Sequence, residues 1–215
     1  MLRNPNGLSI AVVCLLAATA VADLASLAAT AAMRSDLTGP LADHPDPEGY
    51  EGTLSALLAW TAQGMLLIAT AVVFIVWLFR VRGNADVWAP DLQRRAKGWM
   101  IAGWVVPIVA LWFPRTVVVD IWRASRPEPY GADRKGELVL INFWWLFFLV
   151  SQIVSEVGGR SFDDAHDVDT LVAATGWILT GDLTDVVAAV LAILLVRRLT
   201  SMQHQKATGM IPAAQ

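Results

Sequence analysis

The stretch WMIAGWVVPIVALWFPRTVVVDIW, residues 99–122, decides the topology of the chain. Its first half is apolar, but Pro107 and Pro114 interrupt it and Arg115 and Asp120 follow. Each proline removes a backbone donor and clashes with the preceding turn, so a continuous helix is broken twice. Non-helical backbone at membrane depth is stable only where protein covers it or where it lines a cavity. We therefore expect a re-entrant or interfacial element here, and not a crossing helix.

Four other apolar stretches surround this segment, at residues 8–33, 54–79, 138–155 and 171–196. A membrane-spanning helix needs about 20 apolar residues, and the shortest of the four is close to that minimum. The 215 residues are 56% hydrophobic and 16% charged, against about 45–50% and 25% in a soluble domain. This composition excludes a disordered chain and a disulfide scaffold, and it leaves little room for a soluble enzyme domain. It predicts an all-α integral membrane protein: a four-span bundle in one domain, residues 1–200, with a frayed cytoplasmic tail, residues 201–215.

The positions of the basic residues give the expected orientation. If residues 99–122 crossed the membrane, seven of the sixteen Lys and Arg residues would lie on the N-terminal side. If they do not cross, all sixteen except Arg34 and Arg160 lie there, and the positive-inside rule strongly prefers that arrangement. Both termini are then cytoplasmic at the cell membrane, and loops 34–51 and 156–169 are on the opposite side. The net charge of −3 gives no indication of a nucleic-acid partner.

The N-terminus has two interpretations. Arg3, the apolar run and Ala20-Val21-Ala22 resemble a secretory signal with a small-residue cleavage site. The largely apolar run continues to Met33, however, which favours an uncleaved anchor helix.

Three carboxylates lie within the expected spans, namely Asp23, Asp182 and Asp185. An ionisable residue in a span costs a few kcal/mol to insert, so each is a candidate functional residue. Asp182 and Asp185 share a helix face with small residues that permit close helix packing, and we expect them to point into the bundle. Gln63 and Gln152 could join Asp23 in a shared polar cluster. Such a site could carry protons, hold a cation or supply a general acid; alternatively, its hydrogen bonds only fix the helix register.

A second group of candidates belongs to the cytoplasmic side and combines tryptophan with charged and polar residues. Such residues are usual at the membrane interface, where they anchor a protein. Alternatively, arginines pair with an anionic head and tryptophans enclose its apolar tail. An acid paired with one of these arginines would be structural. The candidate residues are Arg82, Asn84, Trp99, Trp104, Trp112, Asp120, Trp122 and Arg123.

Other signals point to no defined chemistry. Residues 163–169, DDAHDVD, contain metal-ligand residue types without a recognised metal-site spacing. Asp169 or Thr170 as the N-cap of the last helix explains part of this run, so we expect no metal. The single Cys14 is expected to be a small packing residue. Nucleotide-binding, dinucleotide-binding and common hydrolase motifs are missing, and the sequence indicates no particular cofactor.

The central region resembles a known family. The pattern begins at Arg80-x-Arg82-x-Asn84-Ala85 and continues through Trp88-Ala89-Pro90. It then runs through Gly98-Trp99-Met100-Ile101, Gly103-Trp104-Val105-Val106-Pro107-Ile108, Leu111-Trp112-x-Pro114 and Asp120-Ile121-Trp122-Arg123-Ala124-Ser125. Together with the last helix, from Asp185 to Gln203, this pattern resembles the domain-of-unknown-function family 4328 of multi-span bacterial membrane proteins. The resemblance implies a location in a bacterial inner membrane and a fold, but no reaction.

Two classes of function follow from these residues. In the first, the bundle binds an amphiphile with an anionic head, a membrane lipid or a prenyl diphosphate. Trp99, Trp104, Trp112 and Trp122 would shape its cavity, and Arg82, Asn84 and Arg123 would hold the head. If the protein is an enzyme, such as a prenyl or terpene cyclase, the catalytic candidates are Asp120, Asp182 and Asp185, and aromatic faces would stabilise cationic intermediates. In the second class, the protein is a non-enzymatic scaffold or a proton- or ion-coupled conduit that uses Asp23, Asp182 and Asp185.

Overall fold

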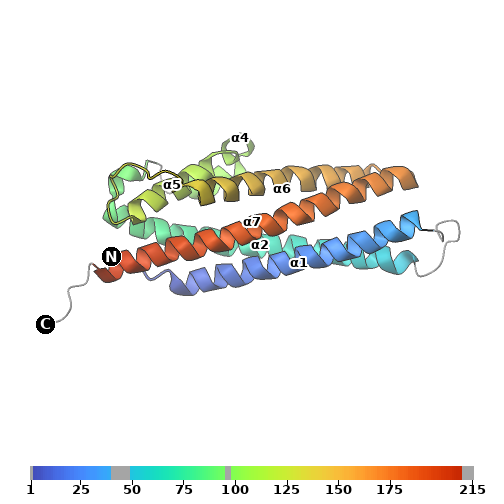
Figure 1. The fold of residues 1–215 in the computed structure, drawn as a ribbon, viewed down its shortest axis with the longest axis horizontal. Helices are drawn as coiled ribbons and strands as arrows, with labels where there is room; N and C mark the ends of the chain where they lie inside the picture. Colours follow the sequence, from blue (N-terminus) through green and yellow to red (C-terminus); the bar gives the residue numbers. More distant parts are fainter. Residues whose placement is uncertain (1, 40–48, 95–97, 210–215) are drawn as a thin grey trace. The chain divides into compact units, whose positions relative to one another are not determined.

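A computed structural model describes residues 2–39, 49–94 and 98–209 of the chain (Figure 1). The regular secondary structure of these residues is entirely helical, without a strand. Four of the helices are long and apolar enough to cross a membrane, which confirms the predicted all-α, four-span fold. They are α1 (Asn6–Thr38), α2 (Gly49–Trp88), α6 (Val139–Asp163) and α7 (Val168–Gly209).

The proline-rich segment forms short helices instead of a span. After η1 (Pro90–Leu92), it contains α3 (Trp99–Val105), α4 (Pro107–Ala110) and α5 (Phe113–Ser125). Proline occupies the first turn of both α4 and α5, where its missing N–H has no intrahelical partner to lose. The longest of the three, α5, has 13 residues, fewer than the roughly 20 that a crossing helix requires. The prolines therefore end one helix and begin the next, as the sequence indicates.

Three of the long helices extend well beyond the apolar stretches that predict them. Helix α2 continues from residue 79 to Trp88, α6 from residue 155 to Asp163, and α7 from residue 196 to Gly209. The prediction of a frayed tail from residue 201 is therefore wrong as far as Gly209. The extensions of α2 and α6 are polar but carry i,i+4 ion pairs, Arg82–Asp86 and Glu156–Arg160. Such pairs favour helix in a polar sequence, so a helix need not end where its apolar pattern ends.

The chain folds into two compact units, where the sequence predicts one domain. Unit 1 contains Met1–Cys14, Thr70–Trp145 and Leu191–Gln215, and unit 2 contains Leu15–Ala69 and Leu146–Val190. Each of the four long helices contributes one part to each unit. The two units differ in the kind of side chain that they bury.

Unit 1 has a core of large aromatic and aliphatic side chains. Phe74 packs against Trp77, Trp104 and Trp144, with ring centroids 5.3, 6.0 and 5.9 Å away. The Trp77 indole donates to Thr200 Oγ1 over 3.2 Å, and the Trp145 indole donates to the Leu111 carbonyl over 2.8 Å. Buried tryptophans need such a partner for the indole N–H. These contacts tie the short helices to α2, α6 and α7.

Unit 2 has a core of small and polar side chains. Ala56, Ala174, Ala188 and Ala189 are buried there. A Cβ added at Gly158 of α6 would lie 3.1 Å from the Ile178 backbone nitrogen of α7, closer than an ordinary contact. Small residues let helix backbones approach in this way. The close packing of α6 and α7 in this unit therefore depends on glycine.

Candidate functional site

The intramembrane carboxylates of unit 2 come together around one amide. The Gln63 Nε2 of α2 donates to Asp23 Oδ1 of α1 over 2.7 Å and to Asp182 Oδ1 of α7 over 3.0 Å. Ser26 Oγ donates to Asp182 Oδ2 over 2.8 Å. Asp23 and Asp182 are 1% and 4% exposed, so both carboxylates are buried. Three helices therefore meet in a single hydrogen-bonded network.

The sequence places these residues on one helix face by its spacing. In α1 the buried positions in this unit are Leu16, Thr19, Asp23, Ser26, Thr30 and Met33, which alternate in steps of three and four. Residues at such spacing lie above one another along a helix. The single buried face of α1 here is polar apart from Leu16 and Met33, so Asp23 is buried among mostly polar side chains.

Asp185 completes the group, one helical turn after Asp182. Its Oδ2 accepts a hydrogen bond from Ser155 Oγ of α6 over 3.4 Å, and its side chain is half-buried. Ser155 can approach because α7 has Gly181 opposite it, where an added Cβ would lie 2.8 Å from Ser155 Oγ. We call Asp23, Gln63, Asp182 and Asp185, with Ser26 and Ser155, the carboxylate cluster.

One atom of the carboxylate cluster lacks the partner that burial demands. Asp23 Oδ2 is buried and accepts no hydrogen bond from any residue that the structure describes. Among the described residues, no Lys or Arg forms an ion pair with Asp23, Asp182 or Asp185. Buried polar atoms are nearly always hydrogen-bonded, and a buried charge is nearly always paired. A bound proton would remove the buried charge and would turn Asp23 Oδ2 from an acceptor into a donor.

The cluster differs from the sequence prediction at α6. Gln152, which we expected to join Asp23 and Gln63, is exposed, and the neighbouring Ser151 is buried in its place. Within the described residues, no three His, Cys, Asp or Glu side chains are close enough to hold a metal ion. The chemistry available to the cluster is therefore that of carboxyl groups, an amide and hydroxyls.

In unit 1, two predicted ligand-binding residues are buried and bonded to the protein itself. The Arg82 Nε lies 3.1 Å from Asp86 Oδ1. The Asn84 side chain accepts from the Arg3 backbone N–H over 2.8 Å and donates to the Arg3 carbonyl over 2.8 Å. It also donates to Gln203 Oε1 over 2.9 Å. Arg82 and Asn84 are thus 3% exposed each and already have protein partners.

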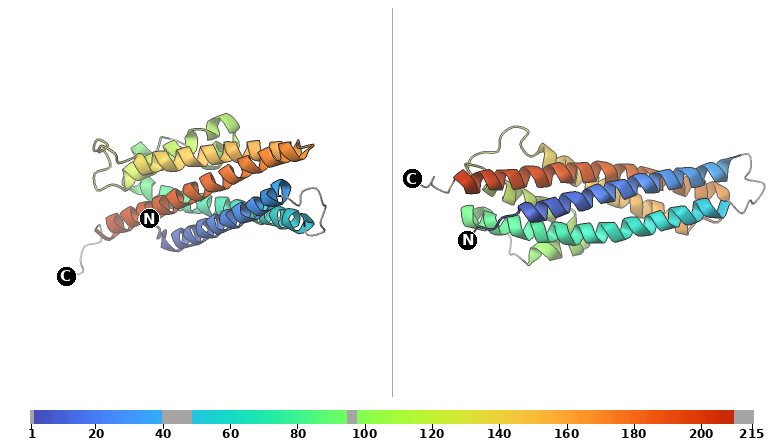
Figure 2. Two further views of the ribbon diagram at one scale, coloured as in Figure 1. Left: turned by 45° about the vertical axis from the view of Figure 1, so that its right-hand side comes forward. Right: turned by 90° about the horizontal axis from the view of Figure 1, so that it is seen from below.

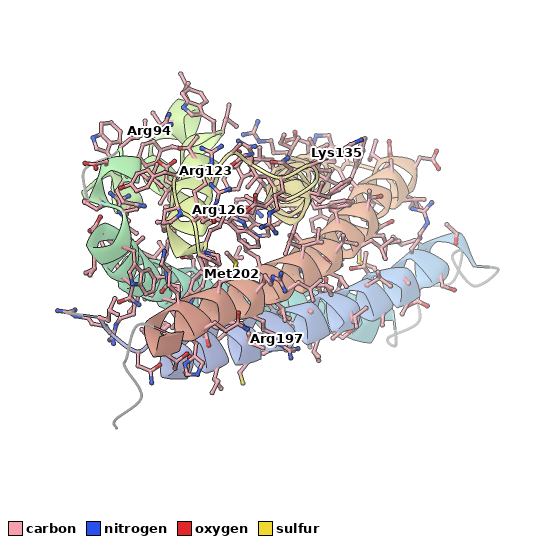
Figure 3. All side chains as sticks on the ribbon, turned by 60° about the vertical axis from the view of Figure 1, so that its left-hand side comes forward. Arg94, Arg123, Arg126, Lys135, Arg197 and Met202 are labelled. Carbon is pink, nitrogen blue, oxygen red and sulfur yellow. The ribbon has the colours of Figure 1, made fainter. Side chains whose placement is uncertain are left out.

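Arg123 of α5 and Arg126, the residue that caps α5, form ion pairs with the loop that precedes α6. Figure 3 labels both arginines. Arg123 pairs with Asp133 over 2.5 Å, and Arg126 pairs with Asp133 and Glu137 over 3.3 and 3.1 Å. The hydrogen bond from Arg123 holds the pKa of Asp133 below its usual value, and the same bond raises the pKa of Arg123. Burial opposes ionisation of Glu137, but hydrogen bonds from the Arg134 N–H and the Trp122 indole, with the charge of Arg126, lower its pKa.

Asp120, the acid that we anticipated as a partner of Arg82 or Arg123, lies near this ion-pair group. It is buried in α5, and its negative charge contributes to the raised pKa of Arg123. Its backbone carbonyl accepts a hydrogen bond from Gln93 Nε2 over 3.1 Å. Arg82 pairs with Asp86, and Arg123 pairs with Asp133.

The four predicted cavity-forming tryptophans have different environments. Trp104 packs in the aromatic core of unit 1, and the Trp122 indole donates to Glu137 Oε1 over 3.0 Å. Trp99 and Trp112 are 45% and 49% exposed. Two hollows in the described part of the chain, of about 420 and 400 Å³, are lined by other residues. The tryptophans therefore divide between core and surface.

Sequence reasoning missed Gln203, which it assigned to the tail. Gln203 is 1% exposed, and its Nε2 donates to the Val81 carbonyl over 2.9 Å and to Ser125 Oγ over 3.1 Å. One turn later, Lys206 Nζ donates to the Ala124 and Arg126 carbonyls at the end of α5. The available signal was the amphipathic continuation of the last helix past Arg198, with Leu199, Gln203 and Lys206 spaced by four and three.

The acidic run before α7 is explained by a helix cap. Asp167 Oδ1 accepts from the Thr170 N–H over 2.8 Å and from the Thr170 hydroxyl over 2.7 Å. The backbone hydrogen bond is the larger cause of a lowered Asp167 pKa. The N-cap is therefore Asp167, and the prediction of Asp169 or Thr170 is wrong by two or three residues.

Comparison with known proteins identifies a family but no activity. No curated protein and no solved structure matches the chain. The family model described as a domain of unknown function (DUF4328) matches residues 50–201, which include most of α2, all of α3 to α6 and most of α7. The chain is therefore a member of the DUF4328 family, as the tryptophan- and proline-rich pattern indicated.

Proposed function

We propose that this protein is a proton-coupled membrane protein, and that the carboxylate cluster takes up and releases the protons. The observation that carries the proposal is the buried, unpartnered Asp23 Oδ2 beside Asp182, with both acids sharing the Gln63 amide. Like charges held this close cannot all ionise in a low-dielectric setting. A cluster of this kind exchanges protons in place of holding fixed charges.

The burial of the three acids supports a path for the proton. Asp23 and Asp182 are buried, whereas Asp185 is half-buried and accepts a long hydrogen bond of 3.4 Å from Ser155. Asp185 is thus the member best able to exchange a proton with its surroundings. Gln63 then connects Asp182 to Asp23, the acid whose free oxygen the proton would occupy.

Proton flux into vesicles tests this function. The protein is reconstituted into proteoliposomes that contain a pH-sensitive dye, and a potassium diffusion potential is applied with valinomycin. We expect the wild type to acidify the lumen, and Asp23→Asn, Asp182→Asn and Asp185→Asn each to reduce the flux at least tenfold. Asp36→Asn is the matched control, because Asp36 is an exposed acid on the same helix as Asp23.

Infrared difference spectroscopy separates proton binding from proton movement. A protonated carboxyl has its own carbonyl stretch, which we expect in the wild type and in Asp36→Asn. We expect this band to lose intensity in Asp23→Asn. If the vesicles show no flux and the band is unchanged in Asp23→Asn, the proposed function is wrong.

The orientation belongs to the same proposal. We place the protein in a bacterial inner membrane with both termini in the cytoplasm, on the basis of the four helices able to cross and the distribution of basic residues. Cysteine labels at Arg126 and at Asp167, in a Cys14→Ser background, test this placement. Labels that react from opposite sides are expected, and two labels on the same side would contradict the four-span topology.

Binding of an amphiphile with an anionic head is the second candidate function. Half-exposed Trp99 and Trp112 favour it, because they offer aromatic surface next to the proline breaks. A phosphate head would compete with Asp133 for Arg123 and with Asp86 for Arg82. Mass spectrometry of lipids and prenyl compounds that co-purify with the protein tests it. A species lost in a Trp99→Ala, Trp112→Ala double variant supports this function, and the absence of any such species contradicts it.

A further inference from the structure

A hollow of about 420 Å³ lies in unit 1, between the beginning of α1 and the end of α7. In both views of Figure 2 these two helix ends are side by side. The volume is within the range of about 300–1,000 Å³ that small-molecule sites have. None of the carboxylate cluster and none of the predicted tryptophans lines it.

The lining changes from polar to apolar. Ile10, Val13 and Cys14 of α1 provide an apolar wall, and Ile10 is 64% exposed although it belongs to a helix apolar enough to cross a membrane. Arg197, Ser201 and His204 of α7 provide donors on the other side. An apolar wall beside a group of donors is the arrangement that a lipid needs, with its chain on the wall and its head at the donors.

The charge of the hollow is positive and uncompensated. No Asp or Glu is among the lining residues. Arg82, Arg123 and Arg126 of the same unit all have carboxylate partners, whereas Arg197 forms no ion pair or hydrogen bond with any residue that the structure describes. Figure 3 shows the Arg197 side chain on α7. Its guanidinium is therefore available to an external anion.

From this arrangement we infer that the hollow between α1 and α7 binds an anionic phospholipid, with the phosphate at Arg197 and an acyl chain along Ile10 and Val13. Arginine suits a phosphate because its planar fork donates two parallel hydrogen bonds. Ser201 and His204 add donors at the same end. A lipid is favoured over a free phosphate, because both helices are apolar enough to cross a membrane and Ile10, Val13 and Cys14 give the hollow an apolar side that a phosphate ion would leave uncovered. The site is independent of the proton function proposed above.

Native mass spectrometry of the purified protein, titrated with single lipids, tests this site. We expect phosphatidylglycerol to bind at least tenfold more tightly than phosphatidylcholine. Arg197→Gln is expected to remove that preference and to leave the weaker phosphatidylcholine binding unchanged. Arg198→Gln is the matched control, because Arg198 is the adjacent exposed arginine and does not line the hollow.

Three results would overturn the inference. The first is equal binding of the two lipids by the wild type, and the second is an equal loss in Arg197→Gln and Arg198→Gln. The third is displacement of phosphatidylglycerol by millimolar inorganic phosphate, which would indicate a simple anion site.

The single cysteine offers a second readout on unmodified protein, because Cys14 lines the hollow. Phosphatidylglycerol should slow maleimide labelling of Cys14 in the wild type and in Arg198→Gln, but not in Arg197→Gln. Asp23→Asn should behave as the wild type, so failure of the proton proposal and failure of this one are distinguishable. Labelling that phosphatidylglycerol leaves unchanged in the wild type would place the lipid elsewhere.

Discussion

Two buried polar side chains, one in each unit, differ in their hydrogen bonds. One of them has a full set of hydrogen bonds and the other does not. The Gln203 amide of unit 1 accepts one hydrogen bond at Oε1 and donates two from Nε2, to Val81 and to Ser125. The Asp23 carboxylate of unit 2 accepts one hydrogen bond at Oδ1 from Gln63, and its Oδ2 has no partner among the described residues. Both residues are 1% exposed, so burial alone does not distinguish them.

The difference separates a group with a purely structural explanation from the one on which the proposed proton function depends. A fully bonded amide holds α2, α5 and α7 in register, and nothing about it requires a ligand. An acid with an unpartnered oxygen costs stability unless a proton or another donor completes it.

The largest change in stability is expected when Gln203, the fully hydrogen-bonded residue, is replaced. Gln203→Ala leaves the Val81 carbonyl and Ser125 Oγ without their donor and opens a cavity. We expect the free energy of unfolding in detergent micelles to fall by about 3 kcal/mol, measured by circular dichroism. Gln205→Ala, at an exposed position of the same helix, should change it by less than about 0.5 kcal/mol. Equal losses in the two variants would show that Gln203 does not hold unit 1 together.

The next effect concerns the close helix packing that supports the acids of unit 2. Gly158→Ala would place its Cβ 3.1 Å from the Ile178 backbone nitrogen, and the backbone cannot move aside as a side chain can. We expect a loss of about 1–2 kcal/mol in the free energy of unfolding. Gly159→Ala is the control, because nothing lies within 4 Å of its Cβ position, and better helix propensity should add up to about 1 kcal/mol. If both variants were stabilised, the close packing of α6 and α7 would be contradicted.

A smaller change in stability is expected at Asp23, which has the unpartnered oxygen. Whether the free energy of unfolding rises or falls there tests the comparison. Asp23→Asn keeps the oxygen that accepts from Gln63 and removes the ionisable group. We expect the free energy of unfolding at neutral pH to stay the same or to rise by up to about 1 kcal/mol. Asp182→Asn should lower it, because the new amide group replaces the oxygen that accepts from Ser26. A clear loss of stability in Asp23→Asn would make Asp23 a structural residue like Gln203.

The smallest change in stability is expected when an ion pair of unit 1 is removed. The pKa of Asp133 is lowered in the folded state by Arg123. Its stabilising contribution is therefore complete at neutral pH, and it is lost as the pH falls through the ordinary value of 3.8 toward the folded value. Asp133→Asn should flatten this acid limb of a plot of stability against pH. Glu128→Gln, at an exposed acid in the same loop, should leave the limb unchanged. If the plots of stability against pH for Asp133→Asn and for the wild type coincide, the Arg123–Asp133 pair contributes nothing to stability.

The site was predictable in part. Asp23, Asp182, Asp185 and Gln63 were identified because polar side chains in an apolar stretch are costly and must find one another. Gln152 was not separable from Ser151 by sequence, since adjacent helical positions differ by about 100° and only packing decides which one faces inward.

The sequence by itself determined the number of helices able to cross and the failure of residues 99–122 to form a further one. Apolar length and proline chemistry act locally, so they can be read directly from the chain. The tertiary structure decided where α7 ends and which buried polar groups are satisfied. Helix α7 extends to Gly209 because Gln203 and Lys206 bind groups on α2 and α5. Asp23 is left with an open oxygen because three helices supply one amide for two acids. Hydrogen bonds between distant residues depend on how helices face one another, and no local pattern encodes that.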